Sequence, residues 1–406
     1  MSDRDPIGRE YARLALHIER HFEGFVDSYY GPPEIKAQVE AEGKRDIAEL
    51  RRSAAALTEA IAQADMDDRR RDFLTRQVRA METVLRRLAG QEMPLAEEVQ
   101  GCFDVVPERV DESEFEAALR EIDALLPGTG DLPTRLAAWR RQFELPQERI
   151  LPVIQMALAE ARRRTAGLLD LPQGEAVEVQ LVTDQPWGGY NWYLGNYRSR
   201  IDVNTDLPVR ANAALALMAH EAYPGHHTEH VIKEQRWYRQ AGRLEHSIQL
   251  LITPESFVAE AIATTAFDVI FPDREELTGW LAEVFYPAAA IQVDAQQQLR
   301  LGDAFDKLDG AGGNAAFLLH DDRRPEDEVL DYLRRYRLYT DQEARLALRF
   351  ISSPQFRTYI FNYSYGRRLL KRAFEAEGML DVFRWAASEP VTPLAIVTQG
   401  LPKAAG

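Results

Sequence analysis

One cysteine, Cys102, occurs among the 406 residues of this chain, so no disulfide can form within it. This excludes the disulfide-rich class of small secreted proteins and any zinc site built from several cysteines. Long apolar runs are also lacking, because no stretch reaches the roughly 18–20 residues of a membrane-spanning helix. Residues 1–6 lack the apolar core of a signal peptide. We therefore expect a cytoplasmic protein that does not bind membranes.

Positive charge is scarce, with 49 lysine and arginine residues against 65 aspartate and glutamate residues and a net charge of −16. No basic stretch offsets this imbalance, so nucleic acid is not an expected partner. The apolar and charged fractions are those of an ordinary globular protein. We expect one unit over residues 1–406, with a helical first half (1–170) and a second half (171–406) that carries the functional site. The sequence leaves the oligomeric state open.

Most of residues 7–170 repeat apolar residues at three- and four-residue intervals, as in residues 46–62 and 68–88. This is the period of an amphipathic helix. Residues 27–33, Asp-Ser-Tyr-Tyr-Gly-Pro-Pro, interrupt the pattern and predict a turn or loop. The sequence therefore predicts a mainly α fold.

The pattern changes after residue 170. Alternation in residues 177–183 and within 190–203 predicts the strands of a small sheet or hairpin. Residues 206–208, Asp-Leu-Pro, supply a cap and an early proline for a helix that starts near residue 209 and is apolar nearly all round, as buried helices are. Residues 309–314, Asp-Gly-Ala-Gly-Gly-Asn, predict a flexible loop.

Four of the eight histidines lie within residues 220–230, at the end of this apolar helix. Burying several such groups unpaired would cost several kcal/mol, so a shared metal ion is expected. The usual His-Glu-x-x-His pattern places its histidines four residues apart on one helix face, yet here that position holds Pro224. Gly225 permits a bulge in the helix. If two residues bulge out, His226 takes the position four residues after His220; if three do, His227 takes it. The sequence leaves both open.

A zinc ion in a catalytic site takes three protein ligands and keeps one position for water. We expect Glu255, in the first turn of a helix capped by Thr253, to be the third ligand of one zinc ion, and Glu260 to orient a ligand from outside. Glu221 follows the first ligand and is the expected general base. Tyr363 is the expected donor to an oxyanion. Its competitors on the same aromatic segment are Tyr359 and Tyr365.

Residues 220–227, His-Glu-Ala-Tyr-Pro-Gly-His-His, resemble the His-Glu-x-x-Pro-Gly-His-His signature of a bacterial family of unknown function, DUF885. Residues 255–260 are similar to that family's Glu-Gly-Trp-Ala-Leu-Tyr-Ala-Glu segment, but depart at Ser256 and Phe257 and place Ile262 where the final Glu would fall. The family is grouped with the gluzincin metallopeptidases and is distantly similar to carboxypeptidase Taq and the angiotensin-converting-enzyme group. The resemblance implies a helical fold with a central cleft, zinc on its floor and hydrolysis of short peptides.

Two other functions fit the same residues. The chain could be a helical peptide-binding module in which the Pro-Gly insert has abolished the metal site. It could also be a metal-dependent hydrolase of non-peptide amides or esters. The sequence does not distinguish endopeptidase from carboxypeptidase action. It also does not identify the metal, because His-His-Glu sites accept several divalent ions.

Overall fold

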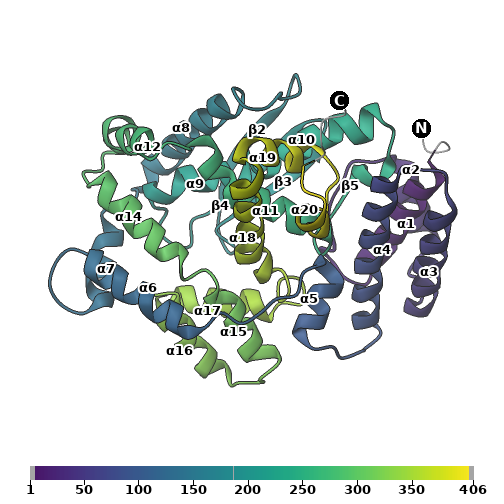
Figure 1. Ribbon diagram of the computed structural model, residues 1–406, viewed down its shortest axis with the longest axis horizontal. Helices are drawn as coiled ribbons and strands as arrows, with labels where there is room; N and C mark the ends of the chain where they lie inside the picture. The colour runs from purple at the N-terminus through teal and green to yellow at the C-terminus, as the bar shows by residue number, and fades with distance from the viewer. Residues whose placement is uncertain (1–4, 186, 402–406) are drawn as a thin grey trace.

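The structure is a computed structural model that describes residues 5–185 and 187–401. Helices form most of it, with two small sheets, which confirms the predicted mainly α fold with small sheet elements. Helices of the N-terminal part lie at one end of the molecule, α6, α7 and α14 lie at the other, and α18 and α19 cross the middle (Figure 1). Helix α11 (Pro254–Ile270) lies behind α18 in this view.

The first half of the chain is helical, as its periodicity predicts. Aspartate side chains cap several of these helices by accepting a backbone N–H of the first turn, for example Asp46 before α3 and Asp67 before α4. The helices are α1 (Pro6–Glu19), α2 (Pro33–Glu42), α3 (Ile47–Gln63), α4 (Asp68–Leu88), α5 (Leu95–Phe103), α6 (Glu112–Leu125), α7 (Leu132–Arg141) and α8 (Gln147–Thr165).

The strands form two separate sheets. They are β1 (Val26–Tyr29), β2 (Ala176–Val182), β3 (Gly189–Gly195), β4 (Arg198–Asn204) and β5 (Ile248–Leu250). The three-stranded sheet has the order β2-β4-β3, with β4 parallel to β2 and antiparallel to β3, so the strands predicted after residue 170 are present. The turn or loop predicted over residues 27–33 is confined to residues 30–32, because β1 pairs antiparallel with β5 before it and α2 begins at Pro33.

The second half of the chain adds further helices of varied length. They are α9 (Ala211–Glu221), α10 (His226–Lys233), the π-helical η2 (Glu234–Gln240), the 3-10 helix η3 (Leu244–Ser247), α11 (Pro254–Ile270), α12 (Arg274–Trp280), the π-helical η4 (Leu281–Phe285), α13 (Tyr286–Ala288), α14 (Ala295–Asp306), α15 (Ala311–His320), α16 (Glu326–Tyr336), α17 (Asp341–Ser352), α18 (Ile360–Glu377), α19 (Met379–Ser388) and α20 (Pro393–Thr398).

Two local predictions fail in this half. Asp206 does not cap α9, which begins at Ala211; its carboxylate instead accepts the backbone N–H groups of Asp184 and Gln185. The predicted loop over residues 309–314 is largely the first turn of α15. Its glycines serve helix packing, because a Cβ on Gly313 would lie 2.9 Å from the ring of Phe361.

Helix α11 joins the three apolar clusters of the interior. Phe257 belongs to the cluster formed with the N-terminal helices, Ala266 to the cluster around α6–α9 and α12–α14, and Ile262 to the cluster with α10 and α19. The organisation of residues 1–406 as one unit stays a prediction, which the shared helix supports.

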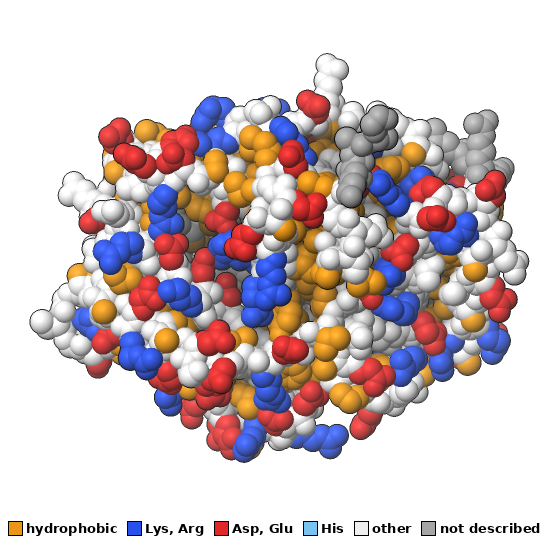
Figure 2. Space-filling model, viewed as in Figure 1, with side chains coloured by type: hydrophobic (Ala, Val, Ile, Leu, Met, Phe, Trp, Pro, Cys, Tyr) orange, Lys and Arg blue, Asp and Glu red, His pale blue; other side chains and the backbone are white. Residues whose placement is uncertain are grey.

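The surface carries mixed charge. Acidic and basic side chains alternate over the face seen in Figure 2. Many of them form ion pairs between neighbouring helical positions, such as Arg163 with Glu160 and Arg334 with Asp331. Among the described residues, none of the helices has both the length and the apolar character needed to cross a membrane.

Helices α11 and α18 approach closely where Gly366 faces Ala261. A Cβ on Gly366 would lie 2.9 Å from the Cβ of Ala261 and 3.0 Å from its Cα, well inside ordinary van der Waals contact. Because Ala261 directly follows Glu260, this contact fixes the turn of α11 that carries the Glu260 carboxylate.

We expect Gly366→Ala to lower the free energy of unfolding by about 1–3 kcal/mol, because the added methyl group overpacks the interface between these helices. Denaturant unfolding measures the change. Gly302→Ala in α14 is the matched control, since a Cβ there meets no atom within 4 Å. That substitution should stabilise by about 0.5–1 kcal/mol. A Gly366→Ala protein as stable as the control would contradict the close approach.

Candidate metal centre

The two histidine-bearing helices are joined by a tight turn. Helix α9 ends at Glu221 and α10 begins at His226. Within the turn the N–H of Gly225 donates to the carbonyl of Ala219 at 2.9 Å. A Cβ on Gly225 would lie 1.9 Å from the carbonyl oxygen of His220, so only glycine permits this approach. The helix is therefore interrupted, where the sequence predicted a bulge within it.

This turn brings His226 beside His220. Their ring centroids are 4.9 Å apart and the rings are nearly perpendicular, at 83°. Of the two candidates that the sequence leaves open, His226 is thus the one that the structure brings to His220.

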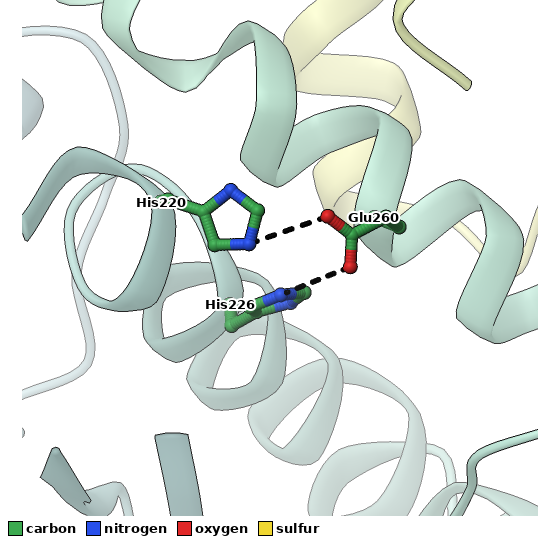
Figure 3. A group of neighbouring side chains, drawn as sticks. All are labelled: His220, His226 and Glu260. Carbon is green, nitrogen blue, oxygen red and sulfur yellow. Dashed lines mark ion pairs between the residues drawn. The ribbon is translucent and has the colours of Figure 1, made fainter. Parts of the chain in front are cut away.

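Glu260 of α11 completes the group. One of its oxygens lies 3.3 Å from Nε2 of His220 and the other 3.8 Å from Nε2 of His226 (Figure 3). One ligand atom from each of the three residues lies within 4.8 Å of the other two, so the group could hold a metal ion. Two imidazoles and a carboxylate are a donor set that zinc accepts.

The surroundings of Glu260 fit a bound cation. The residue is 1% exposed, and its Oε1 has no hydrogen-bond partner among the described residues, whereas Oε2 accepts the Tyr359 hydroxyl at 2.8 Å. Burial raises the pKa of Glu260 to about 8, against the lowering effect of that hydrogen bond. A buried acceptor without a partner is costly, and a metal ion would satisfy it.

The structure does not bring Glu255 into this group. Its carboxylate lies 3.4 Å from the ammonium of Lys233 and 3.8 Å from Nδ1 of His246. Five residues separate Glu255 from Glu260, which in an α-helix means about 7.5 Å along the axis and about 140° around it. The two carboxylates therefore serve different neighbours.

His227 also lies elsewhere. It is fully buried, with Nδ1 2.8 Å from the Ser199 hydroxyl and Nε2 3.0 Å from the Glu175 carboxylate. Glu175 also accepts the Tyr223 hydroxyl and an N–H of Arg162. Both ring nitrogens of His227 are engaged, so this side chain fastens α10 to the three-stranded sheet.

Glu221 stands next to the group. It is 7% exposed, and its carboxylate oxygen lies 4.0 Å from Nε2 of His220. Burial, followed by the nearby carboxylates of Glu260 and Asp27, raises the pKa of Glu221 to about 8. A carboxylate whose pKa is raised toward neutrality can accept a proton as a general base.

One cavity opens onto the candidate metal group and Glu221, but not onto His227. His220, His226, Glu260, Glu221 and Tyr363 line it. The competing tyrosines are engaged, since Tyr359 donates to Glu260 and the Tyr365 hydroxyl is bonded to the backbone of Glu108.

Three further residues of the wall were not predicted from the sequence: Asp27 of β1, Tyr190 of β3 and His230 of α10. No local sequence pattern could have identified Asp27 as a cavity residue. Strand β1 reaches the cavity through its pairing with β5, which lies more than two hundred residues later in the chain. The spacing of His230 from His226 was visible, but it did not reveal which way the ring faces.

The fold recurs in known structures. A predicted lipoprotein of Colwellia psychrerythraea is similar with a TM-score of 0.51 and 14% identity, over 91% of this chain and 68% of that one. A predicted lipoprotein of unknown function from Shewanella oneidensis has a TM-score of 0.50 and 11% identity, over 91% and 79%. An M32 carboxypeptidase from Deinococcus radiodurans R1 has a TM-score of 0.38 and 12% identity, over 94% and 88%. At these identities the likeness to the two lipoproteins shows a shared fold alone.

The sequence comparisons give no family. No protein-family model matches the chain, and no curated protein sequence is significantly similar to it.

Exchanging single carboxylates distinguishes the two possible third ligands. We expect Glu260→Gln to weaken zinc binding by more than about 100-fold, since even residues outside the ligand shell contribute 10- to 100-fold. Glu255→Gln should change the affinity only a few-fold, because its carboxylate faces Lys233. Competition titration with a zinc chelator measures both affinities, and circular dichroism confirms folding. The reverse order of effects would contradict the geometry.

Proposed function

We propose that this protein is a zinc-dependent hydrolase that cleaves peptide bonds in short peptides. The observation that carries the proposal is that His220, His226 and Glu260 open onto the same cavity as Glu221. We infer that the first three hold one zinc ion, so that Glu260 takes the place that the sequence predicted for Glu255. When bound in such a site, zinc acidifies water and polarises a carbonyl group.

The chain's own residues supply the proton transfer. In this proposal Glu221 accepts a proton from water and returns it to the leaving amine, and its raised pKa supports both steps. Asn191 holds this part of the chain by donating from Nδ2 to the Glu221 carbonyl at 2.6 Å. Tyr363 lies on the cavity wall, where its hydroxyl can donate to an oxyanion.

Strand β3 can align an extended peptide. It is an edge strand in the order β2-β4-β3, and its residues Gly189, Tyr190 and Asn191 line the cavity. Addition of a peptide strand to a sheet edge is a common recognition mode. A backbone bound in this way would lie beside Glu221, because a Cβ on Gly189 would be 3.5 Å from the Glu221 carboxylate.

The resemblance to DUF885 supports the same proposal once Glu260 is taken as the ligand. If the Glu-Gly-Trp-Ala-Leu-Tyr-Ala-Glu segment is aligned on Glu260 instead of Glu255, its two alanines coincide with Ala263 and Ala266. Membership in DUF885, or among the gluzincins, is part of this proposal. The cytoplasmic location stays a prediction.

The test is mass-spectrometric profiling of a mixed peptide library with zinc-loaded protein and its Glu221→Gln variant. We expect cleavage by the first and a loss of at least about 100-fold in the second, since general bases contribute about 10²–10⁴-fold. Glu178→Gln, an exposed position on β2, is the matched control and should cleave normally.

The other outcomes identify the alternatives. Zinc-loaded protein that cleaves no peptide would contradict peptidase activity and favour non-peptide amides or esters. Protein that neither binds zinc nor cleaves would favour a peptide-binding module. Cleavage that persists in Glu221→Gln would contradict the role of Glu221.

A further inference from the structure

The cavity at the candidate metal centre is lined by acids without matching bases. Four carboxylates belong to its wall, those of Asp27, Glu221, Glu255 and Glu260, and among its described lining residues there is no lysine or arginine. The ammonium of Lys233 lies 3.4 Å from Glu255 of this wall, but the residue is 1% exposed and its ammonium also lies 2.5 Å from Glu229. The Lys233 ammonium is therefore paired with these glutamates and does not line the cavity.

Charge balance isolates Asp27. Glu260 and Glu221 adjoin the candidate metal centre, where a divalent cation would balance them, and Glu255 faces Lys233. Asp27 is left with one neutral partner, since Tyr190 donates its hydroxyl to one carboxylate oxygen. Asp27 is partly buried. A carboxylate withdrawn from water without a nearby cation is unfavourable, so a positively charged group is the partner that this side chain lacks among the described residues.

A second, independent observation is a buried amide oxygen on the cavity wall that lacks a hydrogen-bond donor in the described part of the chain. Asn191 lines the cavity and is 6% exposed, yet within residues 5–185 and 187–401 its Oδ1 has no hydrogen-bond partner. The amide is already oriented, because its Nδ2 donates to the Glu221 carbonyl. A buried acceptor of this kind is satisfied by a ligand that brings N–H groups.

One aromatic residue, Tyr190, contacts Asp27 through its hydroxyl, and a second ring lies near Tyr190. Trp187 and Tyr190 line the same cavity, with ring centroids 5.4 Å apart. Aromatic faces next to a carboxylate stabilise ammonium and guanidinium groups, because the ring quadrupole attracts positive charge. These rings and Asp27 form one wall, which we call the acidic aromatic wall.

We propose that the acidic aromatic wall binds a positively charged group of the substrate, held by Asp27 close to the bond that is cleaved. This inference rests on the proposed function and adds the substrate class. The cation is either the free amino terminus of a peptide or the side chain of a lysine or arginine. A free terminal carboxylate would meet Asp27 and Glu221 with no lysine or arginine on the wall to receive it, so the wall disfavours carboxypeptidase action.

Binding to zinc-loaded Glu221→Gln protein tests this without turnover. Isothermal titration calorimetry compares four matched tripeptides. The first three are C-terminal amides: one with a free amino terminus and neutral side chains, its N-acetyl form, and an N-acetyl form with one lysine. The fourth is the N-acetyl form with a free carboxylate. We expect at least one peptide with an ammonium group to bind about ten- to 100-fold tighter than the neutral one. This is the gain in affinity that a hydrogen bond to a charged group typically provides. Which of the two does so identifies the source of the cation.

Asp27→Asn in the same background should remove most of that preference, while its amide oxygen still accepts from Tyr190. Glu178→Gln is the control that should keep the preference. Equal binding of all four peptides, no binding of any, tightest binding of the carboxylate form, or a preference unchanged by Asp27→Asn would each overturn the proposal. If Asp27→Asn fails to fold, the comparison of the four peptides with Asp27 intact still decides.

Cleavage of the same peptides by protein with Glu221 intact separates the two proposals. Charge-selective binding without cleavage supports the acidic aromatic wall and contradicts the peptidase. Cleavage without charge preference supports the peptidase and overturns the role of Asp27.

Discussion

The structure depends on a carboxylate buried within an apolar helix. Glu260 lies on α11, whose other buried residues are mostly apolar and reach all three clusters of the interior. Burying a carboxylate there is unfavourable unless a cation or donors offset it. Two imidazoles and the Tyr359 hydroxyl surround it, and the close contact of Gly366 with Ala261 fixes the helix that carries it. A cation held between these side chains would offset the cost of this arrangement.

The interruption between α9 and α10 directs the adjacent side chains of His226 and His227 to different surroundings. Because Gly225 lets the chain fold back onto the carbonyl of His220, His226 faces His220 across the cavity. His227 then points into the interior and joins Ser199 and Glu175, which attaches α10 to the sheet that carries β3. The turn thus places His226 beside His220 and α10 against the three-stranded sheet.

Local sequence patterns predicted those features of the fold that neighbouring residues determine, such as helix bounds and caps. Helix α4 has the bounds that its periodicity indicated, and Thr253 caps α11 as expected. Contacts between distant segments were not predictable in this way. Glu255 has every local sign of a ligand, but only the placement of α11 against α9 and Lys233 shows that Glu260 faces the histidines. The glycines before Asn314 indicated a loop, although they serve packing against Phe361.

The central claim is that His220, His226 and Glu260 bind one metal ion. Anomalous diffraction at the zinc edge, from crystals grown with zinc, tests it most directly. We expect one strong peak about 2.0–2.2 Å from Nε2 of each histidine and from a Glu260 oxygen. A peak beside Glu255 or His227, or no peak at the three residues in zinc-saturated crystals, would contradict it.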